Sequence, residues 1–177
     1  MGSLILRTPR LVLRSWCEDD IPQLLPLISA REVAATTLRI PHPYTRTHAE
    51  EFVRREDSEQ VRCAVLLKDS TTLIGGVGFR LNKDHNHAEI GYWLGVPYWG
   101  KGYATEASAE LLRHGFEDLK LQRIFASHFG NNPASGNILR KLGMKYEGRQ
   151  RGHLLKWGEY LDLEMYGILR DDFVRSS

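Results

Sequence analysis

The sequence predicts one α+β domain, which combines antiparallel hairpins with a single strand–helix–strand crossover. Its 177 residues suit one domain, long enough to bury roughly 70% of the surface that the unfolded chain exposes. Segments 63–79 and 148–168 show the β-forming residues and central turns of hairpins. Residues 88–129 have the pattern of strand, helix and strand, and we expect the two strands of this crossover to be parallel.

The composition limits the partners that the chain is expected to have. Hydrophobic residues make up 42% and charged residues 26%, and the net charge of +2 gives no sign of a nucleic-acid or membrane surface. No apolar run approaches the roughly 20 residues of a membrane span. Cys17 and Cys63 lack a C-x-x-C spacing, which predicts free thiols in a reducing compartment. We therefore expect a cytoplasmic protein with no nucleic-acid partner, no membrane partner and no bound metal.

The first third of the chain predicts one strand and two short helices. Residues 11–16 form the strand, and the acidic run 18–20 begins a helix that Pro26 keeps short or kinked. Two prolines make 40–44 a loop, which either shapes the entrance to a site or is a plain connection. Residues 47–50 match a capping box and predict the start of the second helix.

A glycine-rich hairpin follows. Its strands are 63–67 and 72–79, and three glycines within the second strand mark a bulge, or a place where another backbone or a ligand comes close. In the next turn, His85 and His87 have an H-x-H spacing, but no third ligand stands at a useful distance in the sequence. We therefore interpret this turn as an exposed loop and not as a metal site.

The crossover contains the pattern that first indicates a function. Residues 88–96 alternate with one unbroken apolar face and stop at Pro97, and an apolar stripe over 104–119 predicts a helix of about four turns. Gly100 and Gly102 leave the backbone bare just before that helix, where free N–H groups and the helix dipole favour an anion. The alternative is a tight turn whose glycines only relieve strain. Neither the G-x-G-x-x-G pattern nor the G-x-x-x-x-G-K-[ST] loop of nucleotide-binding proteins fits.

Two well-marked segments complete the chain. Residues 123–129 form the second strand of the crossover, and Asn132 stands where the N-cap of the next helix belongs, with Gly143 as its stop. Lys141, near the end of this helix, either complements the helix dipole or reaches a phosphate. The hairpin over 148–168 then closes the domain.

Taken together, these motifs resemble a known family. Residues 8–14 (TPRLVLR), 88–94 (AEIGYWL), 99–107 (WGKGYATEA) and 132–144 (NPAS through KLGM) are similar, in this order, to the GNAT superfamily of acetyl-CoA-dependent N-acetyltransferases. Within it they resemble the RimJ/RimL-like branch of ribosomal-protein N-terminal acetyltransferases. The resemblance spans nearly the whole chain, so it implies one N-acetyltransferase domain over residues 1–177 and acetyl-CoA as the acetyl donor. It also implies a mostly antiparallel sheet, flanked by helices, whose one parallel pair splays apart to admit the pantetheine arm.

The same resemblance assigns the cofactor contacts. The diphosphate loop of the family has the pattern Q/R-x-x-G-x-G/A, in which Gly102 and Ala104 fill the last two places and Trp99 replaces the polar first residue. The main-chain N–H groups of this loop do not depend on the Trp99 side chain, so we expect the phosphate cradle to remain. The segment 94–96 is expected to pair with pantetheine through main-chain groups, and Asn132 either hydrogen-bonds the cofactor or only caps its helix. The expected cofactor-binding residues are Leu94, Gly95, Val96, Gly100, Lys101, Gly102, Tyr103, Ala104, Asn132 and Lys141.

Acetyl transfer to an amine requires a neutral nitrogen, a donor for the developing oxyanion and a proton for the departing thiolate. Glu89 is the candidate base, because it alternates away from the apolar face of its strand; its alternative role is a surface charge or a structural ion pair. Asp162 and Glu159 are reserve carboxylates. Many relatives have a tyrosine acid where this chain has Leu139, and Ser135 resembles the serine of the RimL-like branch, either as an acid or as a helix cap. A thiol pKa near 8.5 means that weak acid help, from a serine or a water, is enough.

The acceptor follows from the same acid–base chemistry. A free α-amine with a pKa of about 8 is neutral in roughly a tenth of molecules at pH 7, whereas lysine near 10.4 is neutral in well under a thousandth. A site with modest acid and base groups therefore favours a protein or peptide N-terminal α-amine. A small-molecule amine as acceptor, or a non-catalytic CoA-binding or sensing module, stays open as an alternative, and so does the choice between monomer and homodimer.

Overall fold

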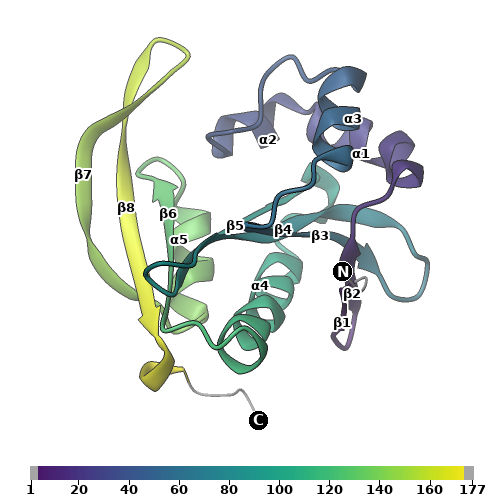
Figure 1. Cartoon of the computed structure of the whole chain (residues 1–177). Coiled ribbons are helices and arrows are strands. Elements are labelled where there is room, and N and C mark those ends of the chain that lie inside the picture. Colours follow the sequence, from purple (N-terminus) through teal and green to yellow (C-terminus); the bar gives the residue numbers. More distant parts are fainter. Residues whose placement is uncertain (1–3, 174–177) are drawn as a thin grey trace.

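A computed structural model describes residues 4–173, and these residues form one eight-stranded sheet with helices on both faces (Figure 1). The strand order is β1-β2-β3-β4-β5-β6-β8-β7, and every neighbouring pair is antiparallel except β5 and β6. The predicted domain boundaries, 1 and 177, extend beyond the described residues. The strands are β1 (Ile5–Arg7), β2 (Leu11–Ser15), β3 (Gln60–Leu67), β4 (Leu73–Asn82), β5 (His87–Leu94), β6 (Arg123–Phe129), β7 (Lys145–Lys156) and β8 (Glu159–Leu169).

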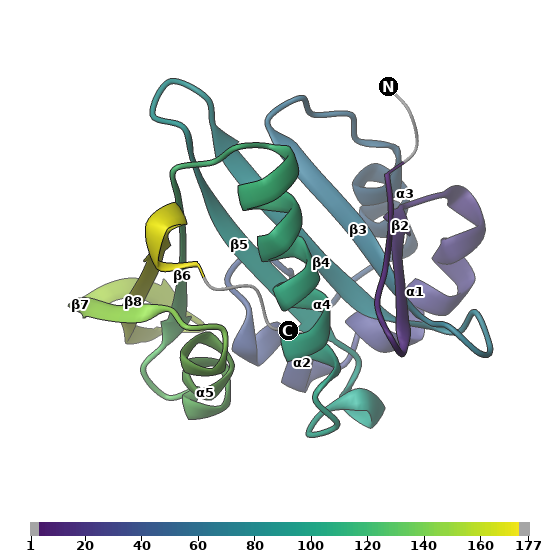
Figure 2. The ribbon, with the colours of Figure 1, turned by 90° about the horizontal axis from the view of Figure 1, so that it is seen from below.

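The helices divide between the two faces of the sheet. Figure 2 shows α4 lying across β4 and β5 on the face opposite α1 and α3. Helix α4 packs Leu111 and Leu112 into the larger core cluster, to which α5 adds Leu139, while α1 and α3 cover a second cluster around Leu73. The helices are α1 (Ile21–Ile28), α2 (Arg31–Thr36), α3 (Arg46–Arg54), α4 (Tyr103–Arg113, continued by a π-helical turn over His114–Asp118) and α5 (Pro133–Lys141).

The parallel pair β5–β6 opens along its length. Only three register pairs join the strands, from His87↔Arg123 to Glu89↔Phe125, although β5 runs on to Leu94 and β6 to Phe129. Beyond Phe125, β6 is paired only with β8. In Figure 1, β6, β7 and β8 turn steeply away from β3, β4 and β5. The expected mixed sheet with one splayed parallel pair is confirmed.

The glycines of β4 match the sequence interpretation. A Cβ on Gly75 would lie 2.2 Å from the carbonyl oxygen of Trp93, and one on Gly78 would lie 2.4 Å from that of Val61. The neighbouring strands therefore approach too closely for a side chain at either position. The register between β3 and β4 also shifts between Val65 and Leu66. Both predicted features, a bulge and a close backbone approach, are present.

Several elements near the N-terminus differ from the prediction. The N-cap of α3 is Thr45 and not Thr47: the Thr45 hydroxyl accepts from the His48 N–H at 3.3 Å, and the Thr45 N–H donates to His48 Nδ1 at 3.1 Å. Histidine thus fills the reciprocal position where Glu or Gln is usual, so the 47–50 pattern lies inside the helix. The acidic run forms a 3₁₀ turn (Glu18–Asp20), and α1 begins only at Ile21. Strand β1 and helix α2 were not predicted, because each is too short to show a period.

Two observations bear on the predicted partners. Within residues 4–173, no helix combines the length and the apolar character that crossing a membrane requires. In the same part of the chain, no group of three or more His, Cys, Asp or Glu side chains is arranged to hold a metal ion. His85 and His87 stack on each other with ring centroids 5.9 Å apart.

Candidate active site

Two cavities meet at the open seam between β5 and β6. The larger has a volume of about 850 Å³ and lies over β3, β4 and β5, and the smaller has a volume of about 330 Å³ and lies between the starts of α4 and α5. We call them the large cavity and the small cavity. Both are lined by the same five residues where they meet: Thr36, Thr37, Tyr92, Trp93 and Ser135.

The small cavity contains an open helix start. Gly102 is the N-cap of α4, with a φ of +80°, and Gly100 has a φ of +72°. No side chain of the described chain caps this helix, and the first bond of the helix joins the Glu106 N–H to the Gly102 carbonyl at 3.0 Å. The amides of Tyr103, Ala104 and Thr105 precede that bond, so they have no partner within the helix. Bare amides at the positive end of a helix dipole are a binding site for a phosphate group.

Glu106 is the first acidic residue of α4, and residues of the turn between β1 and β2 neutralise its charge. It accepts hydrogen bonds from the Thr8 hydroxyl at 2.6 Å, from the Arg10 amide at 2.9 Å and from Arg10 Nε at 2.6 Å. Burial tends to raise the pKa of the Glu106 carboxyl, but these hydrogen bonds outweigh burial and leave its pKa below the usual value. The paired carboxylate therefore adds little repulsion to an anion at the helix start.

The start of α5 forms the facing wall. The Asn132 side chain accepts from the Ser135 N–H at 3.3 Å, so it caps the helix as the sequence predicted. Asn132 and Lys141 both line the small cavity. The cap role of Asn132 is thus visible, and its contact with a cofactor stays a prediction.

The segment between β5 and α4 is largely occupied by its own hydrogen bonds. Trp99 Nε1 donates to the Leu94 carbonyl at 2.7 Å, the Gly95 N–H donates to the Ile74 carbonyl at 2.9 Å, and the Gly95 carbonyl accepts from the Tyr98 N–H at 2.9 Å. Leu94 lines the small cavity, together with the predicted contacts Gly100, Gly102, Tyr103 and Ala104. Gly95, Val96 and Lys101 do not line it. Trp99, which replaces the polar residue of the family pattern, therefore has a structural role of its own.

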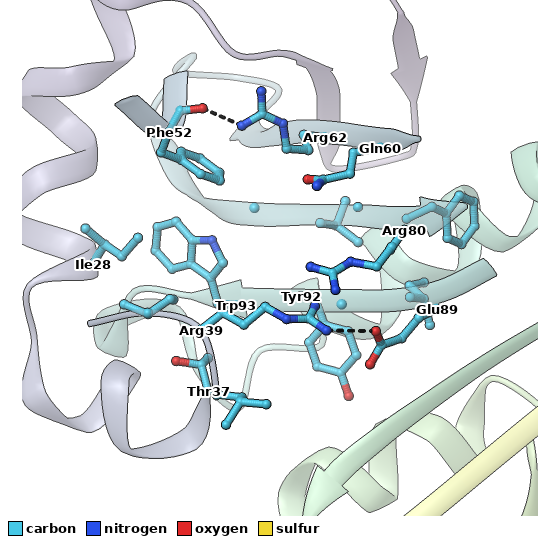
Figure 3. Close-up of a pocket in the computed structure, with 18 of the residues that line it drawn as sticks. Ile28, Thr37, Arg39, Phe52, Gln60, Arg62, Arg80, Glu89, Tyr92 and Trp93 are labelled. Carbon is cyan, nitrogen blue, oxygen red and sulfur yellow. Dashed lines mark hydrogen bonds and ion pairs between the residues drawn. The ribbon is translucent and has the colours of Figure 1, made fainter. Parts of the chain in front are cut away.

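The floor of the large cavity is a hollowed face of the sheet. Across β3, β4 and β5, one row of register partners is Gln60, Arg80 and Glu89, and the next row is Arg62, Gly78 and Gly91. A Cβ built on Gly91 would meet no atom within 4 Å, so the second row leaves space above the backbone. Figure 3 shows the polar side chains of the floor standing into this space.

Aromatic side chains form one wall of the large cavity. Trp16 stacks on Trp93 with centroids 6.5 Å apart, and it meets the ring of Phe52 edge-on at 5.3 Å. Of these tryptophans, Trp16 lines only the large cavity, whereas Trp93 lines both and Trp99 only the small one. The aromatic wall leads from solvent towards the place where the cavities meet.

Glu89 lies where the seam between β5 and β6 begins to open. Its carboxylate points into the large cavity and accepts from Arg39 Nη2 at 3.1 Å (Figure 3). The Glu89 side chain is 26% exposed, whereas the Arg39 side chain, from the loop between α2 and α3, is 56% exposed. The structure thus places the candidate base in the cavity and also shows the ion pair that was its alternative role. The 40–44 loop lies beside it, since Ile40, Pro41 and Tyr44 line the same cavity.

Tyr92 is a functional candidate that the sequence interpretation missed. Its hydroxyl lies 2.7 Å from Ser135 Oγ, at the meeting point of the two cavities. Burial raises the pKa of Tyr92 to about 12, although the hydrogen bond to Ser135 acts in the opposite direction. The phenol therefore keeps its proton at neutral pH and is able to donate. A signal was present, because a tyrosine on the apolar face of a strand must find a partner for its hydroxyl.

The other predicted acid–base residues lie elsewhere. The Asp162 carboxylate accepts from Arg149 and from the Gly152 N–H, and neither Asp162 nor Glu159 lines a cavity. Leu139, at the position of the tyrosine in many relatives, is fully buried in the core. Tyr92 and Ser135 are therefore the candidates for the proton-donor role that the tyrosine has in many relatives.

Residues 10–145 match the family model described as an acetyltransferase (GNAT) domain. This chain belongs to the GNAT acetyltransferase family. A relative from Bacillus subtilis (strain 168), the uncharacterized N-acetyltransferase YoaA, is 30% identical over 174 residues, which cover 94% of this chain and 97% of YoaA. The expected family and the expected class, N-acetyltransferase, are confirmed.

Two solved GNAT structures share the fold along nearly their whole length. RimL, the ribosomal L7/L12 alpha-N-protein acetyltransferase in complex with coenzyme A, has a TM-score of 0.86 and 19% identity, and the match covers 96% of this chain and 99% of RimL. The spermidine N-acetyltransferase from Vibrio cholerae, in complex with CoA and spermine, has a TM-score of 0.83 and 24% identity over 93% and 98% of the two chains. The acetyl donor of this enzyme is acetyl-CoA, and the open amides of α4 fit its phosphates.

Proposed function

We propose that this GNAT enzyme transfers the acetyl group of acetyl-CoA directly to the N-terminal α-amine of a peptide or protein. One observation carries the proposal: the two cavities meet at the Tyr92–Ser135 hydroxyl pair, and the Glu89 carboxylate lines only the large one. A cofactor cavity and an acceptor cavity that share one wall bring two substrates together without a covalent enzyme intermediate.

The small cavity holds the cofactor. The amides from Gly100 to Ala104 take the diphosphate, and Lys141 adds a positive charge on the facing wall. Bound acetyl-CoA supplies an activated acyl group. Asn132 orients the start of α5, which brings Ser135 to the seam.

The large cavity holds the amine. The acceptor arrives mainly as an ammonium group and gives a proton to a carboxylate oxygen of Glu89, while the exposed Arg39 guanidinium moves aside. The neutral nitrogen forms the new C–N bond as the C–S bond breaks. The Tyr92–Ser135 pair donates hydrogen bonds to the carbonyl oxygen during this step. It then gives a proton to the thiolate sulfur and regains one from the nitrogen, which must lose its second proton to become the amide.

The choice of an α-amine is supported by acid–base chemistry, and the known acceptors of the relatives are compatible with it. RimL acts on a protein α-amine, while the Vibrio cholerae enzyme acts on spermidine, so the family includes both protein and small-molecule acceptors. One carboxylate and one hydroxyl pair suit an amine of pKa about 8 better than a lysine or a polyamine. The alternative of a sensing module relied on Leu139, and Tyr92 now supplies the hydroxyl that Leu139 lacks.

Two measurements test the proposal. Thermal unfolding is compared with and without acetyl-CoA, and we expect a higher midpoint with the cofactor; no shift at millimolar concentration contradicts the cofactor assignment. Thiol release is then followed with a short peptide, with the same peptide blocked at its N-terminus, and with spermidine. Release that requires the free α-amine supports the proposal, and release with spermidine alone refutes it. Binding of CoA without release from any amine indicates a sensor.

A further inference from the structure

The large cavity carries an unbalanced positive charge. Two glutamates line it, Glu51 and Glu89, against five arginines. The net charge of the whole chain is only +2, so this excess is concentrated in one place. The five arginines are Arg39, Arg54, Arg55, Arg62 and Arg80.

Three of these arginines already have a carboxylate partner. Arg39 pairs with Glu89, Arg54 pairs with Glu18 at 2.7 Å, and Arg55 lies 4.0 Å from Asp57. Arg62 and Arg80 form no ion pair with any residue of the described part of the chain. They are therefore the two charges of the cavity that a ligand is free to neutralise.

Contacts with Phe52 hold the Arg62 guanidinium in a partly buried position, where an anion would be a favourable partner. One guanidinium nitrogen donates to the Phe52 carbonyl, and the guanidinium lies over the Phe52 ring, 5.0 Å from its centroid. Burial lowers the pKa of Arg62 and the neighbouring charge of Arg55 lowers it further, while the charge of Asp57 only partly opposes them. Among the described residues no carboxylate pairs directly with this partly buried cation, so an acidic group placed against it lowers the free energy of the complex.

The register places Arg62 and Arg80 on the same floor as Glu89. Arg80 stands between Gln60 and Glu89 in one row, and Arg62 is the diagonal neighbour of Arg80 on β3. Figure 3 shows the Arg80 side chain reaching from the Glu89 end of the floor towards Arg39, while the Arg62 guanidinium is turned to the Phe52 carbonyl on the far side of the floor. Arg80 is thus the direct neighbour of Glu89, whereas Arg62 stands at the far end of the row that contains Gly78 and Gly91.

We infer that the acceptor carries an acidic group close to its amine, and that Arg62 and Arg80 bind this group while the amine lies against Glu89. This inference rests on the proposed function and assigns the acceptor as a peptide whose second or third residue is Asp or Glu. Paired guanidinium groups recognise a carboxylate with charge-assisted hydrogen bonds. The same charges repel a polyamine, because every amine beyond the first would meet an arginine.

The test uses acceptor peptides that differ at one position. Three peptides share the sequence Ser-X-Ala-Gly-Trp, with Glu, Gln or Lys at X, and kcat/KM is measured at low salt with saturating acetyl-CoA. We expect the Glu peptide to exceed the Gln peptide by about tenfold and the Lys peptide by more, which is the worth of one or two charge-assisted hydrogen bonds. The Glu preference should fall as salt is raised. Equal rates for Glu and Gln overturn the inference.

Four variants of the lining arginines locate the preference. Arg80→Gln should bring the Glu-to-Gln ratio close to one through KM, and Arg80→Glu should make Lys the preferred residue. Arg54→Gln is the matched control: it removes an arginine from the same cavity, but one that Glu18 already neutralises, so the ratio should persist. Arg62→Lys keeps the positive charge at this position, so the Glu-to-Gln ratio should stay above one. A ratio that survives Arg80→Glu contradicts the assignment.

The result separates the inference from the proposed function. If acetyl-CoA raises the unfolding midpoint and all three peptides react equally, the assignment of a peptide α-amine as acceptor is supported. The assignment of an acidic group beside that amine is then refuted. If no peptide reacts, the proposed α-amine acceptor itself fails. Free aspartate and free glutamate form a second arm: reaction with them and not with the Glu peptide assigns the anion to a small molecule and refutes the peptide as its source.

Discussion

The two cavities of this enzyme are built from different parts of the chain. The small cavity comes mainly from one continuous crossover and the start of α5, and the open main-chain amides of α4 lie in it. The large cavity gathers side chains from β3, β4, β5, α3 and the 37–41 loop. A site made of backbone tolerates many side chains, whereas one made of side chains changes with each substitution. On the proposed assignment of the cavities, cofactor binding and acceptor choice should therefore respond to different substitutions.

The sharpest test of that independence is Glu89→Gln. We expect kcat to fall by about 100-fold, because the variant loses the base, while the dissociation constant for CoA stays within twofold. Steady-state kinetics and calorimetry measure the two quantities. Glu51→Gln is the control, since Glu51 lines the same cavity and the proposed reaction does not use it. A turnover unchanged across pH would remove Glu89 from the mechanism.

Gly102→Val should produce the opposite pattern. The φ of +80° at Gly102 suits glycine, and a β-branched side chain there also enters the phosphate cradle. We expect CoA to bind about 30-fold more weakly, which corresponds to about 2 kcal/mol. Gly158→Val is the matched control, because its φ is +86° and Gly158 lines neither cavity. Undiminished affinity in Gly102→Val would show that the phosphate assignment is wrong.

Tyr92→Phe tests the wall that the cavities share. The variant keeps the ring and removes the hydroxyl that lies 2.7 Å from Ser135 Oγ. We expect kcat to fall by about tenfold, with KM for both substrates within twofold, because the proton donor acts only during the reaction. Ser135→Ala should give a smaller loss, since Tyr92 remains. A larger change in KM than in kcat would mean that the pair positions a substrate instead.

Alkaline unfolding tests two buried tyrosines, of which Tyr44 lines only the large cavity and Tyr92 lines both. Burial raises the pKa of Tyr44 and of Tyr92 to about 12, and both tyrosines line the large cavity. Above pH 10 the unfolded chain loses these protons first and so binds fewer protons than the folded chain, which means that stability falls as the pH rises from 10 towards 12. Tyr44→Phe should make this decline in the unfolding midpoint shallower. An identical decline in wild type and variant would contradict the prediction.

The smallest effect is expected at Asn132, on the facing wall of the small cavity. Asn132→Ala removes the cap of α5 and should cost about 1 kcal/mol, or a fall of about 2–4 °C in the unfolding midpoint. Asn132→Ser retains a cap and should restore the midpoint. If Asn132→Ser still weakens CoA binding, the amide also contacts the cofactor; if it does not, Asn132 is only a cap.

The same contrast explains how far the sequence could predict the structure. The crossover, the open start of α4 and the cap at Asn132 depend on residues that are close in the chain, and their local patterns indicated them correctly. Tyr92 was missed because its partner, Ser135, lies 43 positions away. Arg62 and Arg80 look like solvent-facing strand residues until the register places them on one floor. The cap at Thr45 was missed because its partner is a histidine.

The positions of the tryptophans give this protein an internal optical reporter. Of the four in the chain, Trp99 lines only the small cavity, Trp16 lines only the large cavity and Trp93 lines both, while Trp157 lines neither. On the proposed assignment of the cavities, intrinsic fluorescence of the unlabelled enzyme should therefore follow each ligand separately, once single Trp→Phe replacements assign the emission. The order in which the two substrates enter becomes measurable by rapid mixing, without dyes or coupled assays.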